Sequence, residues 1–250
     1  MTIFACLNVY NEEALLEDCI RSIRSSLPGC QIILIDGAYQ SWITQVKVQA
    51  AFELSNRRRE IGQSLLRFIT PHSNDNTLEI ARAAGVEHIV ECPRNTSGAP
   101  LQIGSGTYAP GEAMPWESEW KKRSQFFSFG VEGDWFFIVD ADERLHGQPA
   151  PLVEDHYGVM LKRDDDIAPY PVHRVFKKVP GLRMFGAHMA VWHDKKLLRK
   201  DSAPILGGCH LEHVWNKRAA IDRVRHMAKG AYYRGGLIPE EQEFRMINDI

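Results

Sequence analysis

The sequence has almost no net charge and no cysteine framework. Its 30 Lys and Arg residues stand against 32 Asp and Glu, which gives a formal net charge of -2 over 250 residues. No global field attracts nucleic acid or an anionic membrane, so any phosphate ligand must be held by local groups. The five scattered cysteines form no C-x-x-C pair and leave an odd one. This favours buried thiols in a reducing compartment over disulfides.

Long apolar runs are missing as well. No uninterrupted run approaches the roughly 20 residues that a membrane helix needs. The first residues carry neither a basic segment nor a small-residue cleavage site. We therefore expect a cytoplasmic protein without a membrane span. Hydrophobic residues make up 44% and charged residues 25%, the balance of an ordinary globular protein.

Short apolar runs alternate with stretches of helical spacing in the first part of the chain. The runs typical of buried strands lie at residues 3–9, 32–35, 86–91 and 135–139. This order predicts an α/β fold with a mainly parallel sheet and helices on both faces, whose ligands gather at the carboxyl ends of the strands. Residues 40–70 interrupt the order, and their mixed pattern indicates an inserted helical or partly mobile segment.

Asp140 and Asp142 follow directly on the apolar run Phe136–Val139, where a predicted strand ends. On an extended segment, two residues at this spacing project to one face, and strand ends are where hard cations meet phosphate oxygens. An Asp-x-Asp pair also occurs in many solvated turns. Its position after a buried strand favours a divalent-cation site, while the alternative is an α/β domain in which the pair is only a turn.

Three segments in order resemble the family 2 glycosyltransferases of the GT-A type. The first strand runs into Asn8-Val9-Tyr10-Asn11-Glu12-Glu13, similar to the family's P-x-Y-N-E-E segment with Asn8 in place of the proline. Asp36-Gly37 and Ser73–Thr77 resemble the end of the second strand and the S-T-D-x-T helix start, separated here by the insertion. Asp140-Ala141-Asp142 matches the D-A-D strand end.

The resemblance implies a nucleoside-diphosphate sugar donor, a UDP- or GDP-sugar, with Mn²⁺ or Mg²⁺ as cofactor. It implies metal ligation by Asp140, Asp142 and His213, with His210 as the substitute for His213. The nucleotide-binding residues that it implies are Tyr10, Asn11, Glu12, Asp36, Lys122, Arg123 and Asp140. The alternative explanation for Asp36 is a turn cap, and Asp75 is better explained as part of a helix start.

The resemblance also divides the chain. Residues 1–147, with the insertion at 40–70, would bind the nucleotide sugar. Residues 148–250 would form a smaller mixed part on the acceptor side, ending in a basic helix from Ala219 to Tyr233. The acceptor is an unidentified hydroxyl compound. An inverting enzyme would use one of Asp194, Glu212 and His188 as its catalytic base, and a retaining enzyme needs none.

Two other functions use similar pieces. A sugar-phosphate nucleotidylyltransferase would place a Gly-rich, basic loop after the first strand, where this chain has the acidic segment Asn11-Glu12-Glu13. A non-catalytic nucleotide- or sugar-binding module would use the same residues without turnover. The sequence has no Gln-x-x-Arg-Trp segment, which favours a single hexosyl transfer over processive polymer synthesis.

Overall fold

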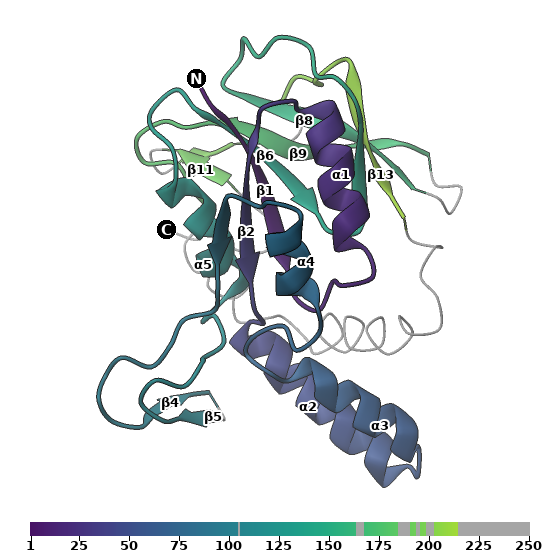
Figure 1. The fold of residues 1–250 in the computed structure, drawn as a ribbon, viewed down its shortest axis with the longest axis vertical. Coiled ribbons are helices and arrows are strands. Elements are labelled where there is room, and N and C mark those ends of the chain that lie inside the picture. Colours follow the sequence, from purple (N-terminus) through teal and green to yellow (C-terminus); the bar gives the residue numbers. More distant parts are fainter. Residues whose placement is uncertain (105, 164–167, 185–190, 194–195, 199–202, 215–250) are drawn as a thin grey trace.

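The fold is built on one eight-stranded sheet. The computed structural model describes residues 1–104, 106–163, 168–184, 191–193, 196–198 and 203–214. Within them the strand order of this sheet is β3-β2-β1-β6-β9-β8-β13-β7 (Figure 1). Its strands are β1 (Ile3–Val9), β2 (Gln31–Asp36), β3 (His88–Val90), β6 (Trp135–Asp140), β7 (Glu143–Gly147), β8 (His156–Arg163), β9 (Tyr170–Lys177) and β13 (Cys209–His213).

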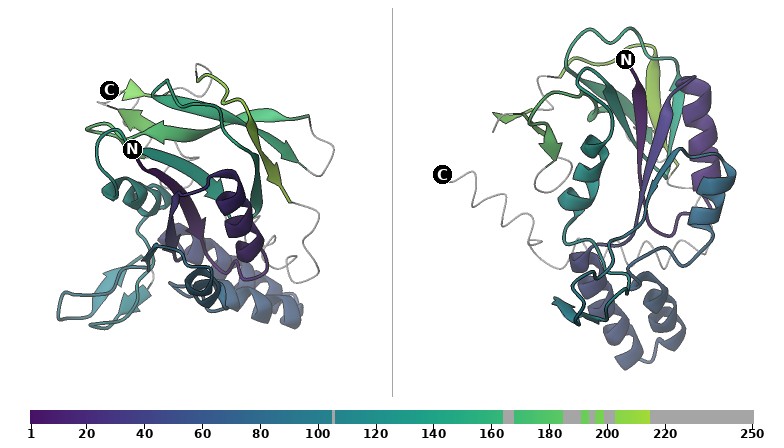
Figure 2. Two further views of the ribbon diagram at one scale, coloured as in Figure 1. Left: turned by 45° about the horizontal axis from the view of Figure 1, so that its top comes forward. Right: turned by 60° about the vertical axis from the view of Figure 1, so that its left-hand side comes forward.

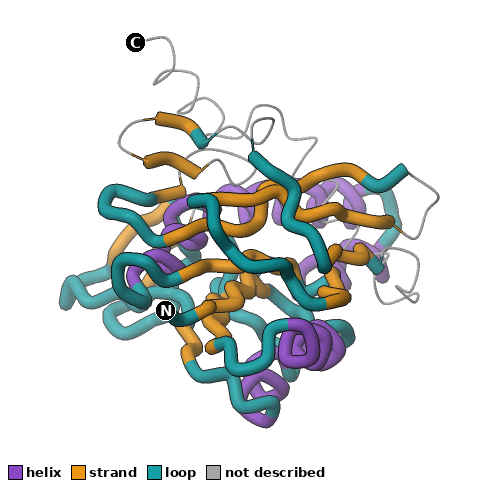
Figure 3. The backbone as a smooth tube through the Cα atoms, turned by 90° about the horizontal axis from the view of Figure 1, so that it is seen from above, coloured by secondary structure: helices purple, strands orange, loops and turns teal. Residues whose placement is uncertain are grey.

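Helices cover both faces of this sheet. α1 (Leu16–Ser26) and α4 (Thr77–Ala83) lie on one face, and α5 (Glu119–Ser124) with the 3₁₀ helix η2 (Gln125–Ser128) lies on the other (Figure 2). Figure 3 shows the same layers from above. Along β1, Leu7 and Val9 join the core cluster under α1, whereas Phe4 and Cys6 join the cluster under η2, because successive strand residues point to opposite faces.

The predicted α/β fold class, with a mainly parallel sheet and helices on both faces, is confirmed. Strands β3, β2, β1 and β6 run parallel, and β9 is antiparallel to both of its neighbours. A smaller antiparallel sheet consists of β10 (Arg183–Met184), β11 (Val191–His193) and β12 (Lys196–Leu197). Both predicted parts of the chain contribute strands to the large sheet. The basic helix predicted at 219–233 lies outside the described residues.

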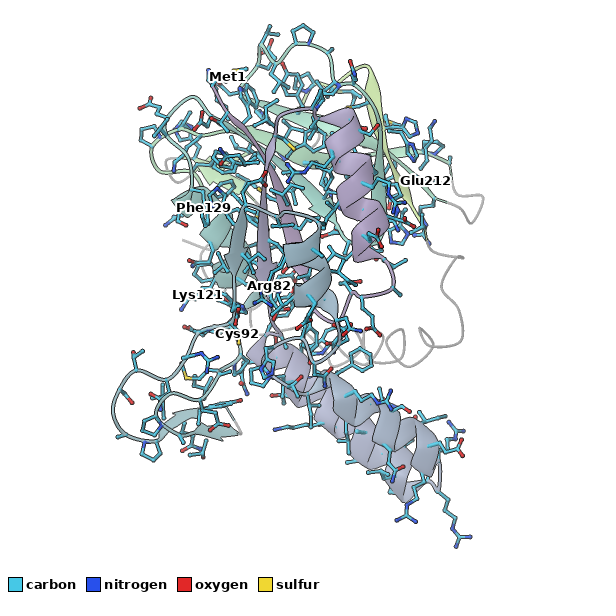
Figure 4. The ribbon with its side chains drawn as sticks, viewed as in Figure 1. Met1, Arg82, Cys92, Lys121, Phe129 and Glu212 are labelled. Carbon is cyan, nitrogen blue, oxygen red and sulfur yellow. The ribbon has the colours of Figure 1, made fainter. Side chains whose placement is uncertain are left out.

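Two projections extend from the same end of the sheet (Figure 1). The segment at 40–70 forms α2 (Gln40–Ser55), α3 (Arg59–Leu65) and the 3₁₀ helix η1 (Leu66–Phe68). Its apolar residues pack against one another in a cluster that includes Trp42, Val46 and Leu65, so the helical expectation is confirmed. The second projection carries the hairpin of β4 (Leu101–Ile103) and β5 (Gly106–Tyr108), and Cys92 lies where the chain departs for it (Figure 4).

The helix before β6 is shorter than its apolar spacing predicts. Helical spacing runs from Trp116 to Gly130, yet α5 begins only at Glu119 because the Ser118 hydroxyl accepts a hydrogen bond from the Lys121 amide, a regular helix cap.

All five cysteines are buried as free thiols. Within the described ranges, no helix is long and apolar enough to cross a membrane.

The strand order reverses direction between β1 and β6. From β1 the chain first builds outward through β2 and β3, and then returns to place β6 on the other side of β1. Asn8 and Asp140 form the last register pair between these two strands. In open α/β sheets, ligands bind outside the carboxyl ends of the strands at such a reversal.

A close approach of two glycines provides a test of the fold. Gly147 has φ +79° and a Cβ there would collide with the Gly208 carbonyl, whereas Gly29 has φ +78° and open space around it. We expect Gly29→Ala to lower the free energy of unfolding by about 1–2 kcal/mol, the cost of a left-handed backbone. Gly147→Ala should cost at least about 1 kcal/mol more. Urea denaturation measures both, and equal losses would contradict the packing of β7 against β13.

Candidate active site

A cavity of about 300 Å³ opens at the carboxyl ends of β1 and β6, where the strand order reverses. Its lining comes from the strand ends, from the start of the α2 projection, from α5 and from β8, β9 and β13. The lining residues are Asn8, Val9, Tyr10, Glu12, Gly37, Ala38, Tyr39, Trp42, Glu119, Lys122, Arg123, Asp140, Ala141, Asp142, Glu143, Leu161, Tyr170, Val172, Arg174 and His213. Distant parts of the sequence thus meet in one polar pocket.

Asp140 lies between two arginines. Its Oδ1 accepts hydrogen bonds of 3.3 Å from both terminal nitrogens of Arg123, and its Oδ2 accepts one of 2.9 Å from Arg174 Nη2. Burial raises the pKa of this carboxyl, but Arg174 and Arg123 outweigh burial and lower it to about 2. Both arginines are nearly inaccessible to solvent, so their charges favour the ionised, accepting form of Asp140.

Glu143 completes this ion network. Its Oε1 accepts a 2.6 Å bond from Arg174, and its Oε2 accepts a 2.9 Å bond from the Asp140 backbone amide. Burial is the main effect on Glu143 and raises the pKa of its carboxyl to about 7, although Arg174 acts in the opposite direction. Through these two bonds Glu143 fixes both the guanidinium of Arg174 and the backbone at the end of β6.

Asp142 faces a different partner. Only Asp140 of the pair lies on the strand, because Ala141 and Asp142 form the turn before β7. The two carboxylates therefore do not lie side by side on one extended segment as expected. Asp142 is buried, and its Oδ2 lies 3.3 Å from Nε2 of His213 at the end of β13. The sheet thus brings together two residues that are 71 positions apart in the sequence.

The residues present fit a metal site only in part. Among the described residues, no group of three or more His, Cys, Asp or Glu side chains could hold a metal ion. Asp142 and His213 offer one carboxylate and one imidazole at the pocket wall. Such a pair suits a cation that keeps several water or phosphate ligands, as Mg²⁺ does in nucleotide sites. The fit therefore requires a bound diphosphate to supply the other ligands.

Lys122 lies deeper than the other cations. It is 1% exposed, and its Nζ donates to the carbonyls of Val9, at 2.8 Å, and Gly37, at 2.6 Å. It thereby ties the end of β1 to the turn after β2. Burial lowers the pKa of its ammonium to about 7, with Asp36 acting in the opposite direction. Lys122 thus binds the strand ends. Of the two neighbouring cations, Arg123 is the one that contacts Asp140.

The remaining predicted nucleotide residues divide into two groups. Tyr10 and Glu12 line the pocket, and the Tyr10 ring stands edge-on to Trp42 at 6.2 Å. Asn11 and Asp36 instead bind the α4 start. The Asn11 side chain accepts from the Asn74 amide, and both oxygens of the fully buried Asp36 accept from Ser73. Asp75 accepts from the Thr77 amide, as a helix start requires.

Glu212 points away from the pocket. It lies on β13, near the edge of the body (Figure 4), and its carboxylate pairs with His146 Nε2 at 2.9 Å. His210 stacks on the same His146 ring at 5.2 Å. Because residues alternate along a strand, His213 faces the opposite side of β13. His188 and Asp194 lie outside the described residues.

No role follows from the sequence alone for Asn8, Tyr39, Glu143 or Arg174, all of which line the pocket. The available signal was weak for all of them. Glu143 follows Asp142 directly, but nothing in that position predicts that its carboxylate turns back to the Asp140 amide. Arg174 lies on β9, and its proximity to Asp140 depends on the antiparallel placement of β9 beside β6.

No protein-family model matches the sequence, and no curated protein matches it either. Among solved structures the chain is similar to glucosyl-3-phosphoglycerate synthase from Mycobacterium tuberculosis in complex with Mn²⁺, UDP and glucosyl-3-phosphoglycerate. That match has 19% identity and a TM-score of 0.29, and covers 57% of this chain and 34% of the other. It is also similar to S. aureus TarS 1-349 in complex with UDP, with 12% identity, a TM-score of 0.36, and coverage of 67% and 38%.

The chain thus spans little more than a third of the length of these two proteins. At such identities and TM-scores the likeness carries no argument about function. The fold class stands on the strand order and directions of the chain itself.

The buried lysine predicts a pH-dependent stability. Above pH 7 folded Lys122 loses a proton that the unfolded chain keeps up to its ordinary pKa. The unfolded state then binds more protons, and stability rises with pH. Relative to Lys122→Met, the wild type should gain about 1 kcal/mol of unfolding free energy per pH unit between about pH 7 and 10. Urea denaturation of both proteins across this range gives the difference, and a constant difference would contradict a neutral buried amine.

The ion network predicts non-additive substitutions. Arg174→Met leaves Asp140 and Glu143 without their shared cation and should lower the free energy of unfolding by about 3–5 kcal/mol. Glu143 already has a pKa of about 7 beside Arg174, and losing the arginine raises it further. At pH 9 its carboxyl must therefore take up a proton or stay charged at a cost. Adding Glu143→Gln removes this cost, so at pH 9 the double variant should be more stable than Arg174→Met alone. Urea denaturation of the two single variants and the double variant measures this coupling. Simple addition of the two losses would show that Glu143 and Arg174 act independently.

Proposed function

We propose that the chain is a divalent-metal-dependent glycosyltransferase. It would move one hexosyl group from a UDP- or GDP-sugar to an acceptor hydroxyl. One observation carries the proposal: the Asp142–His213 pair and the buried cations Arg123 and Arg174 line a single pocket at the reversal of strand order. A diphosphate bears several negative charges, which a bound cation and fixed arginines can share. The pocket offers ligands for the first and supplies the second.

The proposed reaction exchanges two bonds at the anomeric carbon. The bond to the diphosphate oxygen breaks, the acceptor oxygen forms the new bond, and the acceptor proton passes to a base. The leaving diphosphate gains negative charge as the bond breaks, and fixed positive groups in a dry pocket stabilise that charge. Arg123 and Arg174 are such groups, since Asp140, Glu119 and Glu143 hold both guanidiniums in place.

Asp142 and His213 would hold the cation, with the diphosphate and water supplying its other ligands. A bound Mn²⁺ or Mg²⁺ acts as a Lewis acid on the phosphate oxygens. Asp140 is engaged by both arginines, so its role in this proposal is to hold them toward the diphosphate. The acceptor and the base stay undetermined, with His188 and Asp194 as the predicted candidates for the base.

The aromatic side of the pocket supports a nucleoside. Three aromatic side chains line the pocket near the start of α2: Tyr10, Tyr39 and Trp42. Aromatic rings offer a nucleobase a large apolar contact surface, and stacking of this kind tolerates any base. The pocket thus offers aromatic rings near the start of α2 and charged groups near the end of β6, which matches the order of base and diphosphate in a nucleotide.

The proposal predicts metal-dependent nucleotide binding. UDP or GDP with Mn²⁺ should raise the melting temperature, since a ligand at 100 times its Kd stabilises the native state by about 2.7 kcal/mol. Asp142→Asn should abolish the part of the shift that needs Mn²⁺. Asp155→Asn is the matched control, because Asp155 is an exposed carboxylate paired with Lys177 away from the pocket.

A turnover assay separates the enzyme from a binding module. Wild-type protein with a UDP- or GDP-sugar and Mn²⁺ should release the free nucleotide, by transfer or by slow hydrolysis, and Asp142→Asn should not. Binding without any release would favour a non-catalytic module. A thermal shift that Asp142→Asn leaves unchanged would remove Asp142 from the metal site.

A further inference from the structure

Asn8 is an unusual residue for its position. It lies in β1 between Ile35 of β2 and Asp140 of β6 in the strand register. Asparagine is depleted in strands, and this one replaces the proline of the resembling segment. Its side chain lies on the face that also carries Phe4 and Cys6, because residues alternate along the strand. This is the face that α5 covers.

One half of the Asn8 amide is engaged, and the other is not. Its Nδ2 donates to the Tyr39 hydroxyl at 2.9 Å. Its Oδ1 is shielded from solvent and has no hydrogen-bond partner within the part of the chain that the structure describes. The Tyr39 hydroxyl can accept from an amide N–H or donate to an amide oxygen, so it holds the Asn8 amide in either orientation. An unpaired buried polar atom costs free energy, and a bound ligand can offset that cost.

The pocket places Asn8 between its aromatic and its charged ends. Asn8 lines the cavity and contacts Tyr39, which belongs to the aromatic group at the start of α2. On its other side it is paired in register with Asp140, whose carboxylate binds Arg123. A nucleoside diphosphate has the same order of parts: base, ribose and diphosphate. The position between the two ends therefore corresponds to the ribose.

We propose that Asn8 hydrogen-bonds a ribose hydroxyl of the donor nucleotide, so that the pocket selects ribonucleotides over deoxyribonucleotides. This inference rests on the proposed function, because it presumes a nucleoside diphosphate in the cavity. A hydroxyl both donates and accepts, so it satisfies the unpaired atom in either orientation of the amide. Tyr39 holds the other half of the amide.

Calorimetric titration tests the proposal with UDP, GDP and their 2′-deoxy and 3′-deoxy analogues in the presence of Mn²⁺. Wild type should bind one of the two deoxy analogues about tenfold more weakly than the parent nucleotide, the usual effect of one lost hydrogen bond to a buried group. Asn8→Leu, which has nearly the same shape, should bind the parent and that analogue equally. Asn8→Ala is a second variant, which removes the amide without placing a new group in the pocket.

The matched control is Asn56→Leu, the same substitution at an exposed residue at the end of α2, which should keep the wild-type preference. Two results would overturn the inference alone: a wild type that binds the parent and both analogues equally, or an Asn8→Leu variant that keeps the full preference. In both cases nucleotide binding itself would persist. A wild type that binds neither UDP nor GDP with Mn²⁺ would overturn the proposed function as well.

Discussion

The pairing of Asp140 with Arg123 and Arg174 is the interaction on which the site depends. It joins the end of β6 to α5 on one side and to β9 on the other. Buried charges are tolerated only when they are paired and hydrogen-bonded, so these three elements must keep their relative positions. Glu143 closes the network by binding both Arg174 and the Asp140 amide. The charged floor of the pocket is thereby tied to the sheet through both side-chain and backbone bonds.

The fold was predictable because it depends on local periodicity. The buried strands β1, β2 and β6 are short, mostly apolar runs, and β2 and β6 end in an aspartate. A sheet of this kind places such ends at one edge. Side-chain partners across the sheet were not predictable in the same way. Asp36 looks like a ligand-binding carboxylate by position, yet Ser73, 37 residues further on, takes both of its oxygens.

The candidate site was recovered in part for the same reason. Asp140, Asp142 and His213 do line one pocket, but the turn at Asp142 directs it to His213 and leaves Asp140 to the arginines. Asn8 appeared in the sequence only as a departure from a motif. Strand register brings Asp140 next to it, and the loop after β2 brings Tyr39. Such contacts depend on tertiary structure, which propensity and spacing do not encode.

The bond between Asp36 and Ser73 has a consequence for how this chain can vary. Together with the hydrogen bond from the Ala38 amide to the Pro71 carbonyl, it fastens the two ends of the α2–α3 segment to each other at the rim of the sheet. The segment is thus a module whose entry and exit are fixed independently of its length. Lengthening or shortening it costs little loop-closure entropy. Related chains could therefore differ widely in this projection while keeping the same sheet and pocket floor.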